Sequence, residues 1–193
     1  STIGAGPGLG NKAVTKKALL NLLQTATQPL VLDADALNLI AEAWNDGVVF
    51  KLPAGAILTP HLKEFERLAG SYSGSEERLK LLQKFAYTHQ VVVVLKGANT
   101  CIADTEGNVY FNATGNPSLA KGGSGDVLCG SIVGLLASGY TPLHAAIMGV
   151  FVHGLAADLC IRQMGMETVL ASDIIDTLPK AFRLISLRNR KDS

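Results

Sequence analysis

Three short, unbroken apolar runs constrain the fold of this chain more than any other feature. They lie at residues 29–33, 56–59 and 91–95. Strands of this kind are buried on both faces, which is typical of parallel sheets covered by helices. Amphipathic segments alternate with them, at residues 12–26, 36–44 and 75–89. The order predicts an α/β fold, a three-layer αβα sandwich with a mostly parallel sheet.

The second half of the chain begins with a predicted hairpin and continues as helices. Residues 101–104 and 109–111 are the predicted strands of this hairpin, and Gly107 and Asn108 between them supply the positive φ that a tight turn needs. Helices are predicted at residues 126–137, 142–162 and 172–188. The 193 residues fit one domain, so we expect residues 1–193 to form a single unit.

A long stretch without charge, residues 127–157, raises the question of a membrane span. The stretch is broken by Ser138-Gly139-Tyr140-Thr141-Pro142. Its first apolar part, about 12 residues, is shorter than the roughly 20 that a spanning helix needs. The sequence therefore predicts two helices buried in the protein core, and no membrane association.

Charge and cysteine usage exclude several classes of partner and site. Lys plus Arg number 17 and Asp plus Glu number 16, so no strong field draws the chain to nucleic acid or an anionic membrane. The three cysteines form no CxxC pair, and we expect buried, reduced thiols. The first residues have neither the basic nor the apolar region of a signal peptide. A cytoplasmic location is expected.

The strongest signal for chemistry is a glycine-rich segment, residues 115–126, that runs directly into an apolar helix. Glycines allow the backbone to approach a ligand closely, and the free N–H groups at a helix start form an anion site. Asp126 at this point has two alternative roles. It can cap the helix, or it can take the proton of a hydroxyl that attacks a phosphoryl group. The neighbouring glycines favour the catalytic role.

A second glycine-rich segment, residues 4–10, precedes the first helix and matches neither GxGxxG nor GxxxxGK[ST]. A ligand-binding loop and a plain strand-to-helix turn are equally good interpretations of it. Polar clusters also follow the three predicted strands, at residues 33–38, 59–64 and 96–100, where open α/β sheets bind ligands. Lone acids there can also cap helices. For His144 and His153, in the uncharged stretch, we expect core packing.

With these motifs together, the chain resembles the carboxy-terminal, ribokinase-like domain of the NAD(P)H-hydrate dehydratases, which restore hydrated nicotinamide cofactors. The resemblance rests on residues 4–10, 31–38, 58–64, 95–100 and 115–130. Members of that family have a further strand-and-helix block before the first glycine segment, so we expect this chain to lack an N-terminal portion. Ser118 stands where many members have Gly, and Lys121 adds a cation beside the anion loop.

The family resemblance implies particular ligands and site residues. It implies an adenine nucleotide bound by Lys96, Gly97, Ala98, Asn99, Thr100, Gly122, Gly123, Ser124 and Gly125. It implies hydrated NADH or NADPH bound by Gly8, Asp35, Asn38, His61 and Asp126, with Asp126 as the catalytic base. ADP is the usual donor in bacterial members and ATP in eukaryotic ones. Mg²⁺ is expected on the phosphates, without a metal site built from protein residues alone, and a homo-oligomer is expected.

The implied reaction is a nucleotide-driven dehydration of the reduced nicotinamide ring. Asp126 takes the ring hydroxyl's proton while its oxygen attacks the terminal phosphoryl group, and phosphate then leaves. One alternative is a vitamin-precursor or sugar kinase of the same fold. Such kinases commonly carry Asn after the Thr-Pro pair, where this chain has His61. The other alternative is an inert nucleotide-binding fragment.

Overall fold

A six-stranded mixed sheet forms the middle layer of the molecule, with the strands side by side in chain order. The computed structural model describes residues 1–189. The strands are β1 (Ile3–Ala5), β2 (Leu30–Leu32), β3 (Ile57–Leu58), β4 (Val92–Leu95), β5 (Cys101–Ala103) and β6 (Val109–Phe111). Strands β1 to β4 are parallel, and β5 and β6 are antiparallel additions. The mostly parallel sheet and the terminal hairpin are confirmed.

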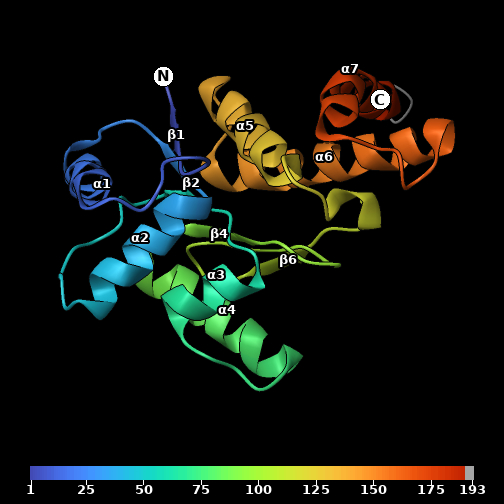
Figure 1. Cartoon of the computed structure of the whole chain (residues 1–193). Helices are drawn as coiled ribbons and strands as arrows, with labels where there is room; N and C mark the ends of the chain where they lie inside the picture. Colours follow the sequence, from blue (N-terminus) through green and yellow to red (C-terminus); the bar gives the residue numbers. More distant parts are fainter. Residues whose placement is uncertain (190–193) are drawn as a thin grey trace.

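Helices cover both faces of this sheet (Figure 1). One layer consists of α1 (Ala13–Thr25), α2 (Ala34–Asn45), α3 (Leu62–Ala69) and α4 (Ser75–His89). The opposite layer contains α5 (Ser124–Ala137) and α6 (Pro142–Met164), and α7 (Ala171–Asn189) packs on α6. A 3₁₀ turn, η1 (Pro117–Leu119), precedes α5. The expected three-layer αβα architecture is confirmed.

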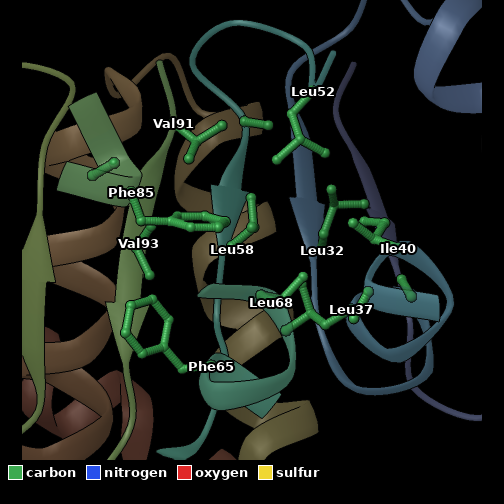
Figure 2. Packing of buried hydrophobic residues seen from close by; sticks show 14 of the residues in the cluster. Leu32, Leu37, Ile40, Leu52, Leu58, Phe65, Leu68, Phe85, Val91 and Val93 are labelled. Carbon is green, nitrogen blue, oxygen red and sulfur yellow. The ribbon is translucent and has the colours of Figure 1, made fainter. Parts of the chain in front are cut away.

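Alternation along the strands supplies both faces of the sheet with apolar side chains. In β2, Leu30 and Leu32 pack against the first helical layer, whereas Val31 between them packs against the second. Phe65 of α3 and Phe85 of α4 are buried in the first interface (Figure 2). Each fully buried side chain of this size contributes roughly 1.5–3 kcal/mol to the stability of the fold.

The uncharged stretch forms two core helices, as predicted. Helix α6 is the one described helix that is long and apolar enough to cross a membrane by composition alone. However, 61% of its most apolar stretch is buried inside the protein. It also crosses α5 closely, because a β-carbon on Gly149 would lie 2.6 Å from Ile132 Cγ1. Burial against α5, α7 and the sheet accounts for its apolar composition.

Some local features differ from the sequence expectations. Strand β1 overlaps the beginning of the first glycine-rich segment, and α3 follows Thr59-Pro60, where only a polar cluster was predicted. Helix α5 begins at Ser124, two residues earlier than predicted. The cysteines are free and buried, as expected. His153 is buried, but His144 lies exposed in the first turn of α6, so its predicted core role is wrong.

Candidate active site

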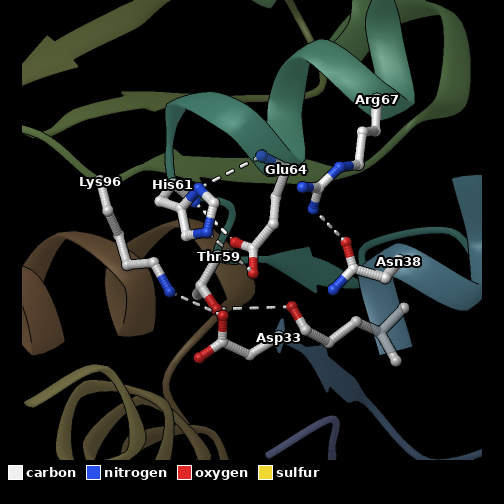
Figure 3. A network of polar contacts seen from close by, with 8 residues as sticks. Asp33, Asn38, Thr59, His61, Glu64, Arg67 and Lys96 are labelled. Atoms are coloured by element: carbon white, nitrogen blue, oxygen red, sulfur yellow. Dashed lines mark hydrogen bonds and ion pairs between the residues drawn. The ribbon is translucent and has the colours of Figure 1, made fainter. Parts of the chain in front are cut away.

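Polar residues from the carboxyl ends of β2, β3 and β4 lie together at one edge of the sheet (Figure 3). Asp33 follows β2, Thr59 and His61 follow β3, and Lys96 follows β4. The ends of β3 and β4 are tied together, since the Lys96 N–H donates to the Pro60 carbonyl at 2.8 Å and His61 pairs with Lys96 in a parallel bridge. Parallel strands all end at this edge, which explains how residues 63 positions apart meet.

A partly buried ion pair lies at this edge. Lys96 Nζ donates to Asp33 Oδ1 at 2.7 Å, and the Asp33 side chain is only 2% exposed. The start of α5 lies directly above the pair, because a β-carbon on Gly125 would be 3.5 Å from Lys96 Nζ and 3.8 Å from Asp33 Oδ2. Lys96 and the glycine-rich segment therefore belong to one site. Asp35 and Asn38 were predicted to bind a ligand, whereas Asp33 was included only in the polar cluster at residues 33–38.

The backbone around Asp33 is strained and tightly packed. Ala34 has a left-handed φ of 47°, which non-glycine residues rarely adopt. Gly6 lies against the Asp33 backbone, and a β-carbon there would be 1.7 Å from the Asp33 carbonyl oxygen. The first glycine-rich segment therefore needs glycine at this position in order to pack beside β2.

The start of α5 has free donors and an acid that does not cap it. Gly123 is the capping residue, with φ 85°, and no side chain caps the helix. The N–H groups of Gly125 and Asp126 in the first turn therefore stay available to an anion, whereas that of Ser124 donates to the Lys121 carbonyl, and the helix dipole adds positive potential. Asp126 lies in this first turn with its side chain exposed. The alternative that Asp126 caps the helix is therefore wrong. Its exposed carboxylate can meet a substrate, as the catalytic role requires.

Two buried groups near the start of α5, Cys129 of α5 itself and His153 of α6, stay uncharged at neutral pH. Burial, with Asp33 nearby, raises the pKa of the Cys129 thiol to about 12, so this thiol cannot act as a nucleophile. Burial likewise lowers the pKa of His153 to about 4. His153 Nε2 lies 3.3 Å from Ser124 Oγ, so the two side chains join α6 to the start of α5. The Ser124 side chain thus points to α6.

The residues expected to bind the hydrate lie around the same edge. The Gly10 N–H donates to Asp35 Oδ2 at 2.8 Å, which ties the first glycine-rich segment to α2. Asn38 Oδ1 accepts a hydrogen bond from Arg67 at 2.7 Å. Gly8 is exposed, with no atom within 4 Å of a β-carbon built on it.

His61 takes part in a reciprocal cap at the start of α3. Its Nδ1 accepts from the Glu64 N–H at 3.2 Å, and its own N–H donates to Glu64 Oε2 at 2.8 Å. The capping box stabilises the helix start. This capping box was not predicted from the sequence, although the spacing of His61 and Glu64 indicates it. His61 remains half exposed, so its ring can also meet a ligand.

The residues expected to bind the nucleotide form two neighbouring segments. Gly97, Ala98 and Asn99 are exposed in the loop between β4 and β5, and Thr100 Oγ1 donates to the Gly97 carbonyl at 3.3 Å. The second segment contains Gly122, Gly123, Ser124 and Gly125, next to Lys96 through Gly125. Within residues 1–189, no group of three or more His, Cys, Asp or Glu side chains gathers to hold a metal ion.

The architecture and this site define the class of protein first. The chain superposes on a ribokinase-like superfamily protein from Enterococcus faecalis with a TM-score of 0.79, at 30% identity, over 94% of this chain and 62% of that one. The class is therefore ribokinase-like. Residues 1–180 match the family model described as NAD(P)H-hydrate dehydratase, and the chain belongs to this family.

Two relatives show how closely the chain follows the family. It is 43% identical over 181 residues to the bifunctional NAD(P)H-hydrate repair enzyme Nnr of Moorella thermoacetica, covering 92% of this chain and 34% of that protein. It is 36% identical, with a TM-score of 0.82, to the ADP/ATP-dependent NAD(P)H-hydrate dehydratase of Bacillus subtilis co-crystallised with ATP/Mg²⁺. That match covers 94% of this chain and 64% of the other. The chain thus spans about a third of the first relative and less than two thirds of the second.

Proposed function

We propose that this protein dehydrates hydrated NADH or NADPH back to the intact cofactor at the expense of ADP or ATP. One observation carries the proposal. The exposed carboxylate of Asp126 stands in the first turn of α5, next to Gly125, which lies against the Lys96–Asp33 pair. A base, an anion site and a cation therefore meet at one edge of the sheet, and the Bacillus subtilis relative named above is an ADP/ATP-dependent dehydratase.

The reaction uses these groups in one sequence. Asp126 takes the proton of the ring hydroxyl as its oxygen attacks the nucleotide's terminal phosphoryl group. The N–H groups between Gly122 and Asp126, apart from that of Ser124, and the Lys96 ammonium hold the negative charge of the transferred group. The bond between ring carbon and phosphate oxygen then breaks, the phosphate leaves with the bonding electron pair, and the adjacent ring carbon loses a proton to water, which restores the conjugated dihydropyridine. Phosphate is a far better leaving group than hydroxide, which is why a nucleotide is consumed.

Mg²⁺ fits the site as an ion held mainly by the nucleotide. When bound, it neutralises phosphate charge, and it usually keeps several waters and only one or two carboxylate ligands. Asp33 fits such a place, because Oδ1 accepts from Lys96 while Oδ2 faces the start of α5.

The hydrate is assigned to the other side of Asp126. Gly8 in the exposed loop, Asp35 and Asn38 on α2, and His61 at the start of α3 all lie at the carboxyl edge of the sheet. These groups offer a carboxylate, an amide and an imidazole to a ligand rich in hydroxyls and phosphate.

We place the chain in the cytoplasm, as one ribokinase-like domain over residues 1–193, acting as a homo-oligomer.

A single assay tests the function. The protein is mixed with NADPH hydrate with and without ADP or ATP, and the dihydronicotinamide absorbance and released phosphate are followed. We expect recovery only with nucleotide, with one phosphate released per cofactor repaired. Full-rate recovery without nucleotide would eliminate the phosphorylation mechanism. Stable phosphorylation of a vitamin precursor or sugar would instead assign the kinase activity of the same fold.

A further inference from the structure

Besides Lys96, a second cation lies near the anion site. It is Lys121 of the second glycine-rich segment, whose ammonium group is turned toward the backbone of the loop between α6 and α7. Lys121 Nζ donates to the carbonyl oxygens of Glu167 at 2.6 Å and Val169 at 2.9 Å, and more weakly to that of Met166 at 3.5 Å. An ammonium group has three N–H donors. All three are matched by carbonyl oxygens of the connection between α6 and α7.

The neighbouring turn is packed against the same part of the chain. Gly123 has a left-handed φ of 85°, and a β-carbon there would lie 3.1 Å from the Ala171 Cβ at the start of α7. The Ser124 N–H donates to the Lys121 carbonyl at 3.4 Å, which closes the turn before α5. The main chain that presents the anion-binding amides is therefore shaped by contacts made on its far side.

The two ends of the glycine-rich segment are fixed to α6 in the same way. At the entry, Asp158 accepts from the Gly115 N–H at 2.9 Å and from Asn116 Nδ2 at 2.8 Å. At the exit, Ser124 meets His153. Between these two attachment points, the ammonium group of Lys121 is the charged group that connects the segment to the rest of the second helical layer.

We propose that Lys121 is a positioning residue: it sets the shape of the anion-binding turn through the loop between α6 and α7, and it does not bind phosphate. This inference rests on the proposed function for its effect on turnover, but not for its effect on the loop. Lys96 has the complementary role, because its ammonium lies against Gly125 at the anion site. To reach a phosphate, Lys121 would have to abandon three hydrogen bonds.

Truncation to alanine provides a test with a chemical rescue. The Lys121→Ala variant lacks three carbons and the ammonium group, which propylammonium restores almost atom for atom. Residue 121 is exposed, so an added amine can reach the carbonyl oxygens. We expect kcat to fall by about 10- to 100-fold, since misplacing reacting groups by about 1 Å has effects of this size. Propylammonium should recover part of the loss, and tetramethylammonium, which has no N–H donor, should recover none.

Hydrogen exchange provides a readout that does not depend on turnover. In Lys121→Ala we expect faster exchange both in residues 120–125 and in residues 165–170, with nucleotide affinity changed by less than about threefold. Lys121→Arg, which keeps a cationic donor, should show a smaller change. Lys96→Ala is the matched comparison, and it should weaken nucleotide binding without loosening residues 165–170.

Three results would overturn the inference. The first is a nucleotide affinity that falls as much in Lys121→Ala as in Lys96→Ala. The second is hydrogen exchange in residues 165–170 of Lys121→Ala that equals the wild type. The third is equal activity of Lys121→Ala with either added amine. A wild-type protein without nucleotide-dependent dehydration would overturn the proposed function instead. In that case the exchange experiment still decides whether Lys121 fixes the loop.

Discussion

The two glycine-rich segments of this protein have similar compositions but very different surroundings. In the first, residues 4–10, Gly8 and Gly10 are exposed with positive φ and open space around them, and Asp35 holds the Gly10 N–H. In the second, residues 115–126, backbone and side chains are bonded to α6 near both ends. Charge stabilisation during phosphoryl transfer requires donors that are fixed in advance. An organic substrate needs space, and an exposed loop provides it.

The largest expected effect comes from the acid at the end of the second segment. Asp126→Asn should lower turnover by roughly 10² to 10⁴, the usual contribution of a positioned general base. Stability should change little, because Asp126 does not cap α5 and its side chain is exposed. Steady-state kinetics, melting temperature and calorimetric titration of nucleotide measure the three quantities. A variant that retains most of its turnover would leave the proton acceptor unidentified.

The next effect tests how firmly α6 holds the second segment in acid. Burial lowers the pKa of His153 from 6.5 to about 4 in the folded protein, so the unfolded chain takes up the proton first. The free energy of unfolding should therefore fall as the pH drops from about 6.5 to 4, by roughly 3 kcal/mol from this residue. Below pH 4 the contribution should level off.

Denaturant titrations at several pH values would measure this effect. His153→Gln removes the titrating group, so its stability should depend less on pH over this window. His144→Gln is the matched control, because His144 lies on the same helix but is exposed, and it should follow the wild type. Parallel curves for wild type and His153→Gln would show that burial of His153 does not control acid stability.

A smaller effect is expected at the cation below the second segment. Lys96→Ala should weaken nucleotide binding by roughly 1.5–3 kcal/mol, the worth of a charge-assisted hydrogen bond, while hydrate binding changes less. The substitution also leaves the buried Asp33 carboxylate without its partner. The double variant Lys96→Ala/Asp33→Asn removes that charge and should recover stability but not nucleotide affinity. Equal loss for both ligands in calorimetric titrations would indicate a structural role.

The same contrast between local and distant contacts explains what the sequence could predict. Strands β2, β3 and β4 are continuous apolar runs, and their pattern is local. The residues after them were predictable as a site because parallel strands end at one edge. Particular partners were not predictable. Asp33 meets Lys96 from 63 positions away and Lys121 meets the carbonyl of Glu167 from 46, so tertiary packing alone selects them.

Helix α3 and strand β1 were missed for different reasons. The His61 capping box was a local signal that went unrecognised, since the segment was interpreted only as a polar cluster. Strand β1 has three residues and is embedded among glycines, so its pattern is too short to indicate a strand. It forms because pairing with β2 satisfies its backbone, for example Ile3 with the Pro29 carbonyl.

The smallest effect concerns the exposed loop and separates its two kinds of glycine. Gly8→Ala places a side chain in open space but forces a left-handed φ of 69°, which costs about 1 kcal/mol. For a chain of this size that corresponds to a melting temperature lower by about 2–4 °C. Gly6→Ala is the matched comparison, because its β-carbon would meet the Asp33 carbonyl oxygen at 1.7 Å and displace β2 or the loop.

We expect Gly8→Ala to fold, to bind nucleotide normally and to show a raised KM for the hydrate. We expect Gly6→Ala to lose much more stability. If instead Gly8→Ala weakened nucleotide binding and left the KM for the hydrate unchanged, the first segment would belong to the nucleotide site, and the division of labour between the two glycine-rich segments would be wrong.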